Sequence, residues 1–155
     1  MSLSIKAKLS SILFLSLSVS AFASQSINCE QLNKSGSIKE NGASLSITLA
    51  SNRNGSLNEE KSRVKSSGFL KDDSEFLLQV RALNESKTRA ERPYATLFLS
   101  EGNDEVLDIQ LQFDRRILGQ EFSEETASFV IGSDDANPET SFSVGYKVLC
   151  NSYLN

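Results

Sequence analysis

The chain has 155 residues, with 16 basic and 20 acidic side chains, a net charge of −4, and no histidine or tryptophan. The acidic balance disfavours binding to nucleic acids and to anionic membrane surfaces, because both attract basic proteins. The lack of histidine excludes Ser-His-Asp and Cys-His nucleophile systems and every histidine-based metal site.

The N-terminal segment has the three parts of a secretory signal peptide. Two lysines give a positive start, an apolar core follows at residues 12–19, and Ala21-Phe22-Ala23 supplies the small residues of a cleavage site. The apolar run is shorter than the ~20 residues of a membrane-spanning helix. We therefore predict a cleaved signal at 1–23 and one exported domain at 24–155, in the periplasm or outside the cell. Cleavage removes two lysines and no acid, so the net charge shifts from −4 to −6.

Alternation of apolar and polar residues predicts about eight β-strands and no amphipathic helix. In chain order, the expected strands are residues 27–33, 44–49, 62–70, 75–83, 94–100, 107–113, 127–131 and 142–150. Strands at regular intervals without interleaved helices indicate an all-β, antiparallel sandwich, with a small β-barrel as the alternative.

Several segments have a pattern that needs a separate interpretation. Leu77 lies on the otherwise polar face of its strand, which suggests a strand covered on both faces. Alternate residues of 142–150 are apolar, so that face is expected to be buried. Asn84–Arg92 and Gln120–Thr126 are candidates for single helical turns or loops, since no apolar stripe would hold a longer helix. Asn52–Glu60 is interpreted as a longer loop or a wide hairpin.

The two cysteines, Cys29 and Cys150, lie near the two ends of the predicted domain. In an exported chain, two cysteines most simply form a disulfide. Asn28 directly before Cys29 fits a lipid-attachment site poorly, which favours a structural thiol. We expect a disulfide that joins the first and last strands. A zinc site is disfavoured, because such sites need about four Cys or His ligands.

Two sets of charged residues are candidates for binding. One acidic loop carries oxygen ligands of the kind that calcium prefers, although an ordinary acidic hairpin loop is the preferred interpretation, because no second loop supplies further ligands. These calcium candidates are Asp134, Asp135, Asn137 and Glu139.

The candidates for a basic patch are Arg89, Arg92, Arg115 and Arg116, with solvated strand edges as the ordinary alternative. No other cofactor is indicated. Three Asn-x-Ser sequons, which accept glycans in eukaryotic secreted proteins, begin at Asn33, Asn54 and Asn84.

The combined pattern predicts a non-enzymatic domain that binds another macromolecule, either a protein or a cell-envelope polymer, through loops or an exposed sheet edge. One alternative is an inhibitor of a secreted hydrolase, of the lysozyme or protease kind, because an acidic domain attracts a basic target. The other alternative is a carboxylate-dependent hydrolase, which would need two acids facing each other across a cleft.

Overall fold

The computed structural model describes residues 23–70, 74–86, 94–102, 104–133, 139 and 141–155, and the fold is all-β. Eight strands follow one another: β1 (Ser24–Gln31), β2 (Ser44–Ser51), β3 (Leu57–Ser67), β4 (Glu75–Ser86), β5 (Tyr94–Glu101), β6 (Asp104–Phe113), β7 (Phe122–Ser133) and β8 (Phe142–Leu154). Each strand expected from the alternating pattern overlaps one of these eight, so the number and order of strands are confirmed.

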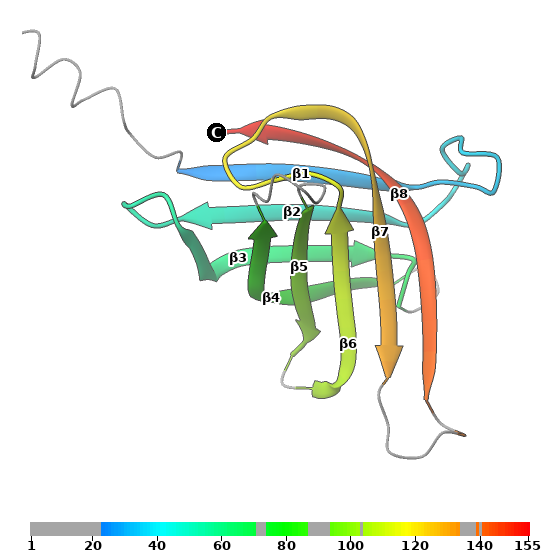
Figure 1. Cartoon of the computed structure of the whole chain (residues 1–155). Helices are drawn as coiled ribbons and strands as arrows, with labels where there is room; N and C mark the ends of the chain where they lie inside the picture. Colours follow the sequence, from blue (N-terminus) through cyan, green and yellow to red (C-terminus); the bar gives the residue numbers. More distant parts are fainter. Residues whose placement is uncertain (1–22, 71–73, 87–93, 103, 134–138, 140) are drawn as a thin grey trace, which may run out of the picture.

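The strands form one closed antiparallel barrel, in which each strand pairs with the next and β8 pairs with β1. The expected sandwich is therefore wrong, and the alternative of a small barrel is the observed fold. A strand that is buried on one face shows the same alternation of apolar and polar residues in a sandwich and in a barrel. The alternation therefore does not reveal whether the first and last strands pair with each other. Figure 1 shows β1–β3 running across the molecule, β5–β7 running in the crossing direction, and β8 curving from one direction to the other.

The interior of the barrel is a packed core. Eight strands enclose a space just wide enough for side chains to fill. The inward positions are accordingly aliphatic or aromatic, and the following are at most 1% exposed: Ile27, Leu45, Ile47, Leu49, Val64, Leu78, Leu97, Ile109, Leu111, Phe129 and Val148. Leu77 does not share this burial. It is 61% exposed on the outside of β4, so the expectation that this strand is covered on both faces is wrong there.

Two turns share the pattern Asn-Lys/Arg-x-Gly-Ser, at Asn33–Ser37 and Asn52–Ser56. In each, the asparagine N–H donates to the carbonyl of the last serine at 2.8 Å. Gly36 and Gly55 have φ values of 87° and 86°, in the left-handed region that glycine adopts without a steric penalty. The second turn is shorter than the loop expected at 52–60, because β3 already begins at Leu57.

The β6–β7 loop, residues 114–121, lies at one end of the barrel (Figure 1). It is held by the side chain of Gln25, which is fully buried. Its Nε2 lies 2.7 Å from the carbonyl oxygen of Ile117, 2.9 Å from that of Gln120 and 2.7 Å from Ser152 Oγ, so its two hydrogens are shared among three acceptors. Its Oε1 accepts the N–H of Gly119 at 2.9 Å. Because every polar atom of this amide has a partner, Gln25 fixes the loop without leaving a buried polar group unsatisfied.

The start of β7 lies in the segment expected to form a single helical turn, and that expectation is wrong. Phe122–Thr126 is extended, with a shift of register between Phe122 and Glu125. Glu124 within this bulge has a φ of 59°. An extra residue in one strand interrupts the alternation of apolar and polar positions, which explains why the sequence pattern does not indicate a strand here. In the other candidate turn, Asn84–Ser86 belongs to β4 and the remainder lies outside the described residues.

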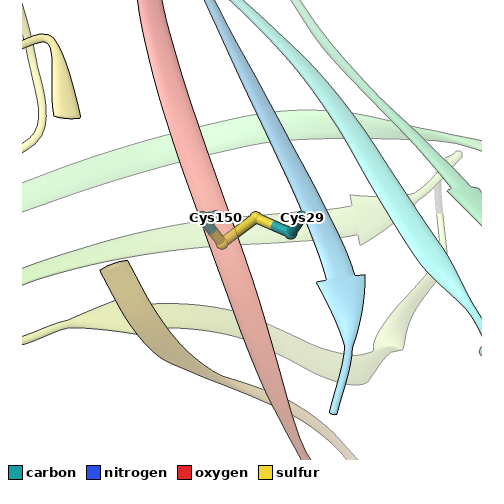
Figure 2. Close-up of a disulfide and its surroundings, with 2 residues drawn as sticks. All are labelled: Cys29 and Cys150. Atoms are coloured by element: carbon teal, nitrogen blue, oxygen red, sulfur yellow. A yellow bond between two sulfur atoms is a disulfide. The ribbon is translucent and has the colours of Figure 1, made fainter. Parts of the chain in front are cut away.

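The predicted disulfide is present and lies where β1 meets β8 (Figure 2). Cys29 and Cys150 are direct partners in the β1–β8 register, with their Cα atoms 4.1 Å apart. Both side chains are buried, at 1% and 0% exposure. The bond therefore joins the first and last strands of the barrel, as expected from the sequence.

Candidate functional site

The outer face of β6, β7 and β8 carries three rows of residues in register. Strand alternation points these side chains outward, while their neighbours on β6, Ile109 and Leu111, point into the core. The rows are Asp108–Gly132–Ser143, Gln110–Val130–Gly145 and Gln112–Ser128–Lys147. We call this set of nine residues the outer grid. It forms one surface that spans three strands.

The β6 side of the outer grid is a chain of side-chain hydrogen bonds. Gln112 Nε2 donates to Gln110 Oε1 at 3.0 Å. Gln110 Nε2 donates in turn to both carboxylate oxygens of Asp108, at 2.9 and 3.1 Å. These bonds hold the amide groups in a fixed orientation and end on a negative charge. Each amide keeps further donor or acceptor capacity for a ligand, since a glutamine side chain has two donor hydrogens and an acceptor oxygen.

The outer grid is hollowed beside Gly132, which has no side chain to fill the space. An open hollow of about 460 Å³ lies here. Its lining residues are Asp108, Gln110, Gln112, Val130, Gly132, Ser133, Ser141, Phe142 and Ser143. A Cβ on Gly132 would lie 3.3 Å from the carbonyl oxygen of Phe142, whereas nothing lies within 4 Å of one on Gly145. Gly132 therefore keeps the floor of the hollow at the level of the backbone.

The β8 side of the outer grid ends in a strand edge without a strand partner among the described residues. The last β1–β8 pair toward this end is Gln31 with Val148, and the Lys147 carbonyl accepts the N–H of Leu32 just beyond that pair, so Phe142–Tyr146 pairs only with β7. Figure 1 shows this part of β8 running with β7 away from β1. Phe142 and Val144 are 48% and 42% exposed. The expectation that the whole apolar face of β8 is buried is wrong at these two positions, because no neighbouring strand covers them.

The chemistry available on the outer grid is hydrogen bonding by neutral amides and hydroxyls, with Asp108 and Lys147 as its charged members. Lys147 Nζ donates to Ser128 Oγ at 2.9 Å. Within the described part of the chain, no group of three or more His, Cys, Asp or Glu residues is placed to hold a metal ion. The arrangement suits recognition of a polar surface through hydrogen bonds.

The candidate basic patch is placed only in part. Arg115 and Arg116 lie in the β6–β7 loop, whereas Arg89 and Arg92 lie outside the described residues. Arg115 is engaged within the molecule: Nη1 lies 2.9 Å from Glu125 Oε1, and the guanidinium lies 4.6 Å from the centre of the Phe122 ring. This arginine therefore stabilises the start of β7, and its charge is already compensated.

The structure describes only one of the four calcium candidates, so it does not show whether their side chains lie close together. Asp134, Asp135 and Asn137 lie outside the described residues, and Glu139 is exposed and already makes an interaction. Calcium binding by this loop stays a prediction. The outer grid was not predicted as a site, because its residues have the pattern of the polar side of ordinary strands. Its signal in the sequence is the alternation Asp108-x-Gln110-x-Gln112, which the register places beside Gly132 of β7.

The part of the chain that the structure describes contains no helix long and apolar enough to cross a membrane. Comparisons with known proteins give no relative from which a site could be transferred: no family model, no curated protein and no solved structure matches this chain.

Proposed function

We propose that this protein is a non-enzymatic, exported binding domain, and that the outer grid on β6–β8 is its recognition surface for another macromolecule. The observation that carries the proposal is the combination of the oriented Asp108–Gln110–Gln112 chain with the hollow beside it. Outward polar side chains in a strand are common. An oriented chain of amides beside a concave floor is a more specific feature, because it presents fixed donors and acceptors to a complementary surface.

The size of the hollow supports this proposal. Its volume of about 460 Å³ lies within the ~300–1,000 Å³ typical of ligand pockets, but it is open to solvent on one side. An open hollow on a sheet fits one protruding side chain or one unit of a polymer better than it encloses a whole small molecule. The Phe142 ring at its margin adds apolar contact area to the polar floor.

The test compares two variants of the exported domain. In the first, Asp108, Gln110 and Gln112 are all replaced by alanine, which removes the oriented chain from the outer face. The control is Gln79→Ala, which removes an exposed amide from the outer face of β4. Both variants should keep the urea midpoint of the parent, because the changed residues lie outside the core.

Binding is measured first by affinity capture from the extracellular or envelope fraction of cells that make the protein, and then with the purified partner. We expect the parent and Gln79→Ala to form the same binary complex, and the triple variant to bind at least about tenfold more weakly, the loss expected from about 1.4 kcal/mol of lost hydrogen bonding. Equal binding by the triple variant would refute the assignment of the surface. Turnover of a sugar or ester library by the parent domain would refute the non-enzymatic proposal.

A further inference from the structure

We infer that the free edge of β8 pairs with the same edge of a second copy of this chain, in an antiparallel and twofold-symmetric manner centred on Val144. This inference concerns the assembly of the protein and stands independently of the proposed recognition function. It rests on the direction of the backbone groups along β8, on the order of its side chains, and on the lack of charge along the edge.

The backbone of β8 presents its free hydrogen-bonding groups at alternate residues. Lys147 directs its carbonyl away from β7, since that oxygen accepts the N–H of Leu32 at 2.8 Å. In a strand, the N–H and C=O of one residue point to the same side, and the next residue points its groups to the opposite side. Ser143 and Gly145, four and two residues before Lys147, therefore also direct their N–H and C=O groups away from β7. The Cys29 and Cys150 Cα atoms are 4.1 Å apart, the close spacing of a non-hydrogen-bonded pair in an antiparallel ladder. Even-numbered residues of β8 therefore direct their backbone groups toward β7, and odd-numbered residues direct theirs away from it.

The side chains along this edge form a chemical palindrome. Residues 142–146 are Phe-Ser-Val-Gly-Tyr, which is aromatic, small, branched, small, aromatic. Antiparallel pairing centred on Val144 places Ser143 opposite Gly145 of the second copy, so the residues with free backbone groups face each other. It also places Phe142 opposite Tyr146, on the face where Phe142 and Val144 are about half exposed. Aromatic cross-strand pairs are among the stabilising ones in antiparallel sheets.

The edge also lacks the features that normally prevent such pairing. Exposed strand edges are usually protected by lysine, proline or a bulge. Residues 142–146 contain no charged residue and no proline, and their pairing with β7 has no register shift. The nearest charge is Lys147, which lies just beyond the five paired residues, because its carbonyl is already bonded to Leu32.

The pairing joins β6, β7 and β8 of two copies into one six-stranded sheet. Stable complexes bury about 1,000 Å² or more, and five paired residues cover less than this, so we expect a reversible dimer that forms at micromolar concentrations and above. The two outer grids then lie on the same side of one sheet. If the proposed recognition function is correct, the dimer presents two equivalent hollows to a repetitive or symmetric partner.

The register is tested by cross-linking through single cysteines. Val144→Cys should form a disulfide with the same position of a second copy under mild oxidation, because twofold pairing places this position opposite itself. A mixture of the Phe142→Cys and Tyr146→Cys variants should cross-link faster than either variant alone. The control is Leu77→Cys, on the outside of β4 and 61% exposed. Cross-linking at position 144 that is no faster than at position 77 would overturn the proposed pairing.

The association itself is measured by sedimentation equilibrium of the unmodified domain without any added ligand, so the result does not depend on the recognition function. We expect a monomer–dimer equilibrium for the parent. In Val144→Lys the two lysines face each other, and the dissociation constant should rise at least about tenfold. Urea denaturation confirms that this variant is folded. A parent that stays monomeric at high micromolar concentration, or a Val144→Lys variant that dimerises like the parent, would refute the inference.

Discussion

Removal of the disulfide between Cys29 and Cys150 should lower the stability of the barrel strongly without changing its fold. The bond closes a loop with a sequence separation of 121 residues, which includes seven of the eight strand-to-strand pairings. In the folded state the two cysteines are already register partners on adjacent strands. The bond therefore restricts the unfolded chain far more than it restricts the native barrel.

The magnitude follows from the entropy of closing this loop. The chain-entropy relation assigns about 5 kcal/mol at 25 °C to a closed loop of this length, and measured values for disulfides commonly lie at about 2–4 kcal/mol. We expect the variant with alanine at both positions to lose about 3–5 kcal/mol of unfolding free energy. For a domain of this size, each kcal/mol corresponds to roughly 3–5 °C, so the melting temperature should fall by about 9–25 °C.

The assay is urea denaturation followed by circular dichroism, with the parent domain oxidised, the parent domain reduced, and the double alanine variant. The reduced parent and the variant should agree, and both should show a larger m-value than the oxidised parent, since the uncrosslinked unfolded chain exposes more surface. An oxidised parent that unfolds at the same urea concentration as the variant would refute the reasoning. It would mean that closure of the barrel does not depend on the bond.

Three further substitutions test the packing of the barrel. Gln25→Leu should cost about 2–4 kcal/mol in urea denaturation, because it leaves several buried groups of the β6–β7 loop without their hydrogen-bond partner. Gly55→Val should cost about 1–2 kcal/mol by the same measurement, because its φ of 86° is unfavourable for a residue with a side chain. Leu77→Lys should change thermal stability by less than about 0.5 kcal/mol, since Leu77 is exposed; a larger loss would show that it packs against something.

The secondary structure could be predicted from the sequence because burial on one face imposes a period of two. This signal was sufficient for residues 44–49 of β2 and 107–113 of β6, where apolar and polar residues alternate without interruption. It failed at the start of β7, where the bulge at Glu124 breaks the period. Closure into a barrel was not decided by the pattern, because the pairing of β1 with β8 is a contact between the two ends of the chain.

The candidate site was less accessible to sequence analysis than the fold. Cys29 and Cys150 were paired correctly, since two cysteines allow a single intramolecular pairing. The outer grid could not be identified, because its rows depend on the registers of three strands, and the sequence does not give a register. The exposure of Phe142 and Val144 depends on where β1 stops pairing. Their sequence pattern is that of buried residues.

In a barrel whose strands pair in chain order, every neighbouring pair of strands is connected by a turn except the pair of β1 and β8. The disulfide supplies this missing connection, so the chain between Cys29 and Cys150 is a covalent ring. A single cut in any turn of that ring leaves one molecule with all strands still attached. A protease that cuts a turn between the two cysteines would therefore produce two new ends but no separate fragments until the disulfide is reduced.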